Sequence, residues 1–96
     1  MTTLTIVANV YAKADQIELV KGAAVALVAV TRRQEGCIRY DLHQDNENPA
    51  HFLFYEDWDS RASLQKHMNS QYVKCFFAVI EGAIEPPVLN EMTRIT

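Results

Sequence analysis

The chain has 96 residues, of which 49% are hydrophobic and 22% charged, and its formal net charge is -3. This composition is typical of a globular protein and excludes a disordered chain, a coiled coil and collagen. A chain of this length builds one core, so we expect residues 1–96 to form a single domain. Because no basic cluster is present, nucleic acid and an anionic membrane are not expected as partners.

The two cysteines and the chain start indicate the compartment. Cys37 and Cys75 lie far apart and outside any CxxC motif, and ligands with zinc-finger spacing are lacking. His43 and His51 lie across a predicted hairpin, but no third ligand is evident, so we expect no metal. The start, MTTLTIVANV, does not resemble a signal peptide, and no apolar stretch approaches the roughly 20 residues of a membrane span. These features predict a cytoplasmic protein with free thiols.

The first third of the chain is predicted to form a strand and a helix. Leu4–Ala12 alternates as a strand and carries apolar residues on both faces. Apolar residues then recur at helical spacing from Ile17 to an end near Arg32–Arg33. Asp15 and Glu18 have the spacing of a capping box at the start of this helix.

A hairpin and two short helices are predicted next. Cys37–Asp45 and His51–Trp58 form the hairpin, and the first of these strands carries Ile38, Tyr40 and Leu42 on one face. Asp59–Ser60 and Asn69–Ser70 offer N-cap oxygens for two helices, which are predicted to end near Met68 and before Gly82. Val88–Ile95 is predicted to be the last strand.

This order of elements predicts an α+β fold of the ferredoxin-like, split βαβ type. Its four-stranded antiparallel sheet has helices on one face only. Since Leu4–Ala12 is apolar on both faces, the uncovered face would expose several hundred Å² of apolar surface, which monomers rarely tolerate. We therefore expect a homodimer that packs sheet against sheet.

The strand His51–Trp58 places one carboxylate, Glu56, on a face shared with Phe52, Phe54 and Trp58. Glu56 either pairs with a cation in a structural role or lies in an apolar cavity, where burial would raise its pKa and suit it to proton transfer. His67 lies on an apolar helix face and is either a core histidine or a proton acceptor. With Asn9 and Tyr72 these residues would enclose one pocket, provided that the side chain of Asn9 points toward the helices.

Three segments together resemble a known family. They are EGCIRYD at residues 35–41, FLFYEDW at residues 52–58, and the helical stretch from His67 to Tyr72. The chain resembles the antibiotic biosynthesis monooxygenase domain family, which includes small quinol monooxygenases. The resemblance covers nearly the whole chain and implies a dimeric α+β barrel that oxidises a small aromatic, quinol or polyketide-type substrate with O2, without a cofactor. The positions that match the family's site are Asn9, Trp58, His67 and Tyr72, with Glu56 beside them.

In this interpretation His67 is the expected base, because an unperturbed histidine pKa of about 6.5 suits proton transfer near pH 7. Glu56 either orients His67 or replaces it as the base. Asn9, Trp58 and Tyr72 would donate hydrogen bonds to the substrate oxygens, and Phe52, Phe54 and Phe76 would bind the substrate and exclude water.

Three alternatives to oxygenation remain. Haem-degrading relatives have an iron-ligating histidine where this chain has Phe76–Phe77, so haem degradation is not expected. An isomerase of phosphorylated autoinducer-2-type substrates shares the segment around Arg39 and the pair Gln44–Asp45, but no cluster of cations is evident. A non-catalytic binder of small hydrophobic ligands would use the same pocket with its polar residues merely satisfied in the core.

Overall fold

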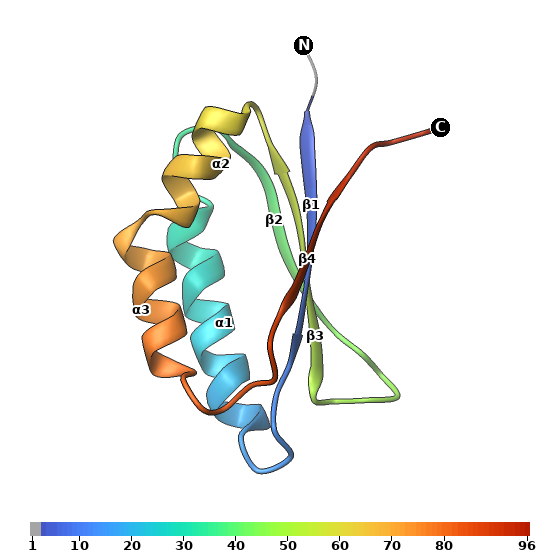
Figure 1. Cartoon of the computed structure of the whole chain (residues 1–96), viewed down its shortest axis with the longest axis vertical. Helices are drawn as coiled ribbons and strands as arrows, with labels where there is room; N and C mark the ends of the chain where they lie inside the picture. Colours follow the sequence, from blue (N-terminus) through green and yellow to red (C-terminus); the bar gives the residue numbers. More distant parts are fainter. Residues whose placement is uncertain (1–2) are drawn as a thin grey trace.

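The structure is a computed structural model that describes residues 3–96. Its elements, in chain order, are β1 (Leu4–Tyr11), α1 (Ile17–Thr31), β2 (Cys37–Gln44), β3 (His51–Trp58), α2 (Arg61–Met68), α3 (Gln71–Val79) and β4 (Val88–Met92). The strands form one antiparallel sheet in the order β2-β3-β1-β4, and all three helices cover the same face of it (Figure 1). This confirms the predicted ferredoxin-like α+β fold.

The helix starts follow the predicted capping in two cases out of three. The hydroxyl oxygens of Ser60 and Ser70 accept hydrogen bonds from the backbone N–H groups of Ser63 and Val73, which caps α2 and α3 as expected. The capping box of α1 is wrong. Gln16 occupies the N-cap position without a side-chain bond, so Asp15 lies one residue too early to cap the helix.

Side chains of β3 alternate strictly between the two sheet faces. Its even-numbered residues, among them Glu56 and Trp58, are buried beneath the helices. On β2 a bulge interrupts this alternation, because Cys37 pairs with Trp58 while Arg39 already pairs with Asp57. Ile38 is the extra residue and is 59% exposed, so its predicted place on a face with Tyr40 and Leu42 is wrong.

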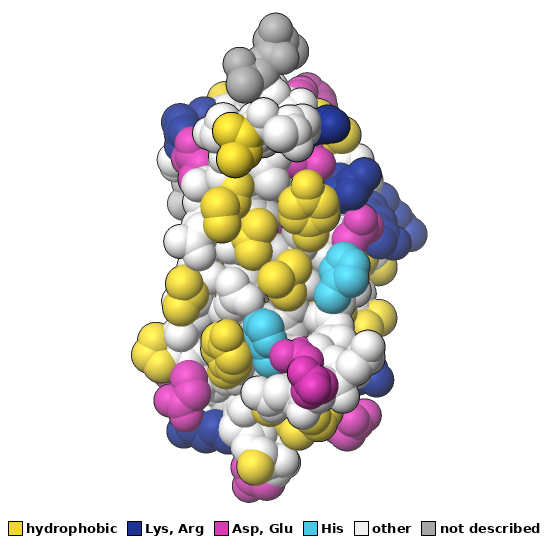
Figure 2. Space-filling model, turned by 90° about the vertical axis from the view of Figure 1, so that its right-hand side faces the viewer, with side chains coloured by type: hydrophobic (Ala, Val, Ile, Leu, Met, Phe, Trp, Pro, Cys, Tyr) yellow, Lys and Arg dark blue, Asp and Glu magenta, His cyan; other side chains and the backbone are white. Residues whose placement is uncertain are grey.

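The opposite face of the sheet has no helix over it. The pairing register places six apolar residues there: Val7, Tyr11, Leu53, Tyr55, Val88 and Met92. Figure 2 shows this open face, where apolar side chains gather in the middle and charged ones lie toward the edges. The strand ends also differ slightly from the prediction, because β1 stops at Tyr11 and β4 stops at Met92 instead of Ile95. We call the sheet face without helices the open face.

Candidate functional site

A small cavity of about 30 Å³ lies between the helices and the sheet. Two polar side chains, Glu56 from β3 and His67 from α2, line it among apolar and aromatic groups. The other lining residues are Ala8, Val10, Leu27, Tyr40, Phe54, Met68, Val73, Phe76, Phe77, Pro87 and Leu89. Among the residues 3–96, no lysine or arginine lines this cavity. We call it the Glu56 cavity.

Glu56 is a buried carboxyl group with a single polar partner. Its side chain is 4% exposed, and Oε1 accepts a hydrogen bond of 3.0 Å from the indole Nε1–H of Trp58. Within residues 3–96 no lysine, arginine or histidine forms an ion pair with it. Burial raises the pKa of Glu56 to about 7, and the bond from Trp58 offsets only part of this rise. The carboxyl group is therefore partly protonated and partly ionised near neutral pH.

His67 is held in the cavity wall by contacts on several sides. Its ring centroid lies 4.7 Å from the Trp58 ring and 5.3 Å from the Tyr40 ring, and Nδ1 lies 2.8 Å from Oε1 of Gln34. Only 2% of the residue is exposed, and burial lowers its pKa to about 4. The ring is thus neutral at pH 7. Its pKa is lower than the unperturbed value expected from the sequence.

Tyr40 lines this cavity, and Gln34 contacts His67 without lining it, but both residues were absent from the predicted set. Tyr40 lies opposite Glu56 in the sheet and is 3% exposed, and burial raises its pKa far above the ordinary value. Its place on a strand face was predictable, but nothing in the sequence indicated a contact with His67. Gln34 lies in the loop after α1, where no periodicity indicates the direction of a side chain.

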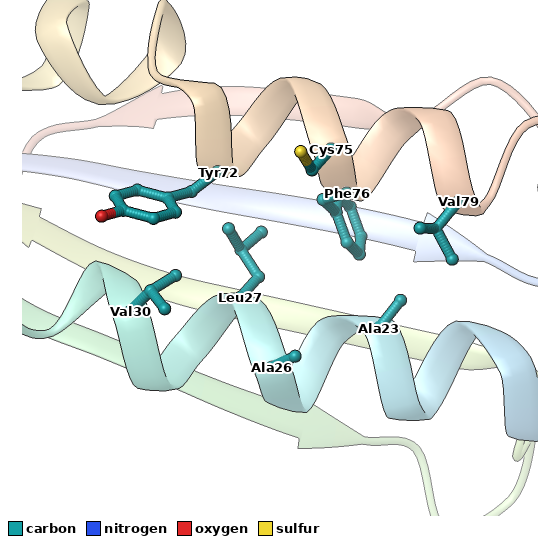
Figure 3. Close-up of a pocket in the computed structure, with 8 residues that line it drawn as sticks. All are labelled: Ala23, Ala26, Leu27, Val30, Tyr72, Cys75, Phe76 and Val79. Carbon is teal, nitrogen blue, oxygen red and sulfur yellow. The ribbon is translucent and has the colours of Figure 1, made fainter.

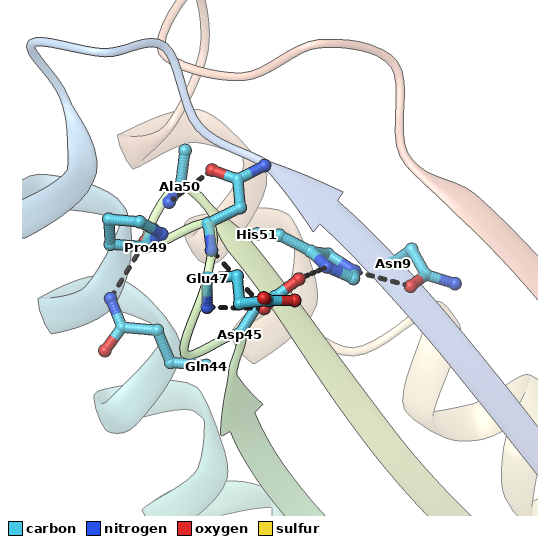
Figure 4. A network of polar contacts seen from close by, with 8 residues as sticks. Asn9, Gln44, Asp45, Glu47, Pro49, Ala50 and His51 are labelled. Atoms are coloured by element: carbon cyan, nitrogen blue, oxygen red, sulfur yellow. Dashed lines mark hydrogen bonds and ion pairs between the residues drawn. The ribbon is translucent and has the colours of Figure 1, made fainter.

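Asn9 does not reach the Glu56 cavity. It pairs with Leu53 on the open face, and its Oδ1 lies 2.8 Å from Nε2 of His51. His51 in turn contacts Oδ2 of Asp45 at 3.2 Å (Figure 4). Its ring also stacks on Tyr11 with ring centroids 4.5 Å apart. The condition set for Asn9 is therefore not met, since it joins this network on the other side of the sheet.

Tyr72 lines a different depression. An apolar groove of about 220 Å³ runs between α1 and α3, and Tyr72 lies at one end of it, half exposed to solvent (Figure 3). Leu27 and Phe76 line both this groove and the Glu56 cavity, so they form the wall between them. Of the predicted phenylalanines, Phe54 and Phe76 line the cavity, whereas Phe52 is buried in the core without lining it.

Two kinds of site are lacking from the described part of the chain. Within residues 3–96 no group of three histidine, cysteine, aspartate or glutamate side chains is arranged to hold a metal ion. None of the described helices is both long and apolar enough to cross a bilayer.

The fold and this cavity define a ferredoxin-like α+β protein with a buried carboxyl group and a neutral histidine in an apolar pocket. The family model of the antibiotic biosynthesis monooxygenases matches residues 3–79, and the chain belongs to this family. The predicted family resemblance is thereby confirmed. The family and the fold support a monooxygenase-like or small-molecule-binding role.

Similar proteins come from several organisms. A crystal structure of the Pseudomonas aeruginosa protein PA3566 superimposes with a TM-score of 0.94 at 30% identity, covering 100% of this chain and 97% of that one. A crystal structure described as an antibiotic biosynthesis monooxygenase has a TM-score of 0.91 at 28% identity, covering 97% and 99%. An uncharacterised protein of Synechocystis sp. is 29% identical over 92 residues, which are 96% of this chain and 63% of that protein. The chain thus spans less than two thirds of this last relative.

Proposed function

We propose that the protein is a cofactor-independent monooxygenase that oxidises a small aromatic or quinol-type substrate with O2, and that Glu56 is its base. The observation that carries the proposal is a carboxyl group that is buried in an apolar cavity, lacks a cationic partner among residues 3–96 and has a pKa of about 7. A general base is most effective when its pKa lies near the working pH. His67, with a pKa of about 4, is much less suited to take up a proton at pH 7.

Direct reaction of a closed-shell aromatic with triplet O2 is spin-forbidden as a concerted step. Deprotonation by Glu56 would give a substrate anion, which passes one electron to O2. The resulting radical and superoxide combine to form a peroxide. For a substrate with an activated methylene group, such as an anthrone, this methylene group and one molecule of O2 become a carbonyl group and one molecule of water overall. Glu56 returns its first proton to the peroxide. It then removes the second C–H proton as the O–O bond breaks, and it passes this proton to the leaving hydroxide, which departs as water.

The neighbours of Glu56 have supporting roles in this proposal. Trp58 holds one carboxyl oxygen, and the neutral ring of His67 adds a polar group without adding a charge that would keep Glu56 ionised. Phe54 and Phe76 exclude water, which strengthens electrostatic interactions with the developing oxyanion. Asn9 and Tyr72 have no direct role here, because neither lines the cavity.

The cavity must open to admit an aromatic ring. A volume of about 30 Å³ holds a water molecule or two but no ring. Met68, Phe77 and Leu89 line the cavity and are partly exposed, so they form its rim. Displacement of these three side chains would widen the cavity for a substrate.

The proposal includes a homodimer that functions in the cytoplasm. The open face carries the six apolar residues named above and has no helix over it. A second copy packed on this face would remove the apolar surface from water, which favours association. Free thiols at Cys37 and Cys75 suit a reducing compartment.

A non-catalytic binder of small hydrophobic ligands is the second candidate. The apolar groove between α1 and α3, which adjoins the Glu56 cavity, favours it. The isomerase of phosphorylated substrates has less support, because no lysine or arginine of the described chain lines the cavity to hold a phosphate group.

Oxygen uptake with a panel of hydroquinones and anthrones tests the proposal. We expect uptake above the uncatalysed rate with at least one compound, and a 10²–10⁴-fold lower kcat for Glu56→Gln, roughly the contribution of a positioned base. Glutamine keeps an oxygen for the Trp58 N–H, so the fold should persist. Glu81→Gln, at an exposed glutamate, is the matched control and should keep full activity. Binding without oxygen uptake would favour the binder, and full activity of Glu56→Gln would remove Glu56 from the mechanism.

A further inference from the structure

The contact between Gln34 and His67 decides which ring nitrogen of the histidine carries the proton. Oε1 of Gln34 lies 2.8 Å from Nδ1 of His67. With Oε1 of Gln34 facing the ring, Nδ1 is the donor, because a carbonyl oxygen only accepts hydrogen bonds, and Nδ1 then carries the hydrogen of the neutral ring. The other nitrogen, Nε2, then has a free lone pair.

The rest of the ring is fixed by aromatic contacts. Trp58 lies tilted by 33° against His67, and Tyr40 meets it nearly edge-on at 68°. Within residues 3–96 no side chain or backbone group forms a hydrogen bond with Nε2. His67 lines both the Glu56 cavity and a second depression of about 140 Å³ that Gln34 also lines. Since Nδ1 is bonded to Gln34 on the side of this second depression, Nε2 is the nitrogen that remains for a molecule in the Glu56 cavity.

The loop that carries Gln34 is tied to the start of α2. Gly36 has a φ of +88°, which favours glycine, and a Cβ there would collide with the side chain of Ser63. The carbonyl oxygen of Gly36 accepts a hydrogen bond of 2.9 Å from the N–H of Asp59, and Asp59 accepts one of 2.6 Å from Ser63 Oγ. This close approach holds the loop against the helix that carries His67.

Gln34 carries no charge, and this affects the protonation of both His67 and Glu56. A carboxylate at this position would favour an imidazolium ring, as in pairs of aspartate and histidine. A positive His67 would in turn favour the ionised form of Glu56 in the same cavity. An amide supplies the acceptor without a charge, so His67 stays neutral near pH 7 and adds no charge that would lower the pKa of Glu56.

We propose that Gln34 is a positioning residue for His67, which it holds in the Nδ1–H tautomer so that Nε2 faces the cavity as a hydrogen-bond acceptor. The occupant's matching group is a donor, such as a phenolic or quinol hydroxyl. This last step rests on the proposed function, whereas the tautomer does not.

The test is a ¹⁵N NMR measurement of the His67 ring in the full chain at pH 7, with Gln34→Met and Gln34→Glu as variants. We expect the Nδ1–H tautomer in the wild type. Methionine keeps the size but removes the acceptor. The ratio of Nδ1–H to Nε2–H should then fall on the order of fivefold, the value of one hydrogen bond of about 1 kcal/mol. Glutamate should give a ring protonated on both nitrogens.

Gln44→Met is the matched control, because Gln44 also forms one side-chain hydrogen bond, to the carbonyl oxygen of Pro49, far from His67. It should leave the ring signals unchanged. An Nε2–H tautomer in the wild type, or the same tautomer ratio in Gln34→Met, would overturn the proposal. Because these signals are read without substrate, they do not depend on whether the protein consumes oxygen.

Discussion

Glu56 and Trp58 lie two residues apart on the same face of β3, and the indole Nε1–H of Trp58 donates a 3.0 Å hydrogen bond to Oε1 of Glu56. Both side chains are buried, so neither group can exchange this bond for one to bulk water. The bond gives the buried indole N–H an acceptor and holds one oxygen of the carboxyl group in place. The carboxyl group is still partly protonated near pH 7.

Trp58→Phe should raise the pKa of Glu56 above that of the wild type. The lost hydrogen bond favours the ionised carboxylate, so its removal leaves burial as the dominant influence. An NMR titration of the Glu56 carboxyl carbon measures the change. An unchanged or lower pKa in Trp58→Phe would show that this bond does not stabilise the ionised form.

The free energy of unfolding should respond to pH in opposite ways through Glu56 and His67. The pKa of Glu56 is about 7 in the folded chain, against an ordinary value of 4.5, so its contribution falls as the pH rises from about 4.5 to 7. The pKa of His67 is about 4 in the folded chain, against an ordinary value of 6.5, so its contribution rises from about pH 4 to 6.5. Each slope is at most about 1.4 kcal/mol per pH unit, and the two largely cancel.

Single substitutions should reveal each slope. Relative to the wild type, Glu56→Gln should gain stability as the pH rises from about 4.5 to 6.5, and His67→Gln should lose it. Urea unfolding at several pH values in this range measures both. Parallel curves for the three proteins would mean that neither pKa is shifted by burial.

Asn9→Ala and Tyr72→Phe should keep kcat within about threefold of the wild type on a confirmed substrate, because both side chains lie outside the Glu56 cavity. His67→Ala should lower kcat by roughly fivefold to tenfold, since it removes a hydrogen-bond acceptor worth about 1 kcal/mol from the cavity that it shares with Glu56. Steady-state oxygen uptake compares the three variants. If Asn9→Ala lost most of its kcat while His67→Ala kept the kcat of the wild type, the site would lie on the open face instead.

Leu53→Glu should dissociate the proposed homodimer, because it places a charge in the apolar middle of the open face. Val25→Glu is the control, since Val25 is 55% exposed on α1, on the helical side of the molecule. Analytical ultracentrifugation at micromolar concentration should give dimers for the wild type and Val25→Glu, and monomers for Leu53→Glu. A monomeric wild type would refute the dimer.

The sequence predicted the fold and the Glu56 face well because β3 alternates without interruption. It left the direction of Asn9 open, because both faces of β1 are rich in apolar residues and alternation alone did not decide which face is covered by helices. Tyr72 was expected to line the pocket, but its position along α3 directs its side chain away from the Glu56 cavity. The inward face of α3 is formed by Val73 and Phe76, and Tyr72 precedes it by one residue.

Gln34 and the bulge at Ile38 could not be predicted for a different reason. Both depend on contacts between segments distant in the chain, namely α2 against the loop after α1 and the shifted register of β2 on β3. The pKa values also required the folded chain, because burial of Glu56 and His67 causes both shifts.

The most direct test of Glu56 as the base is the pKa of its carboxyl group in the wild-type chain. A ¹³C NMR titration of side-chain carboxyl carbons, with the Glu56 signal assigned by its disappearance in Glu56→Gln, measures this value. We predict a midpoint near pH 7, well apart from those of the exposed glutamates. A midpoint near 4.5, the ordinary value for a glutamate, would contradict the proposal that Glu56 is poised to take up a proton at neutral pH.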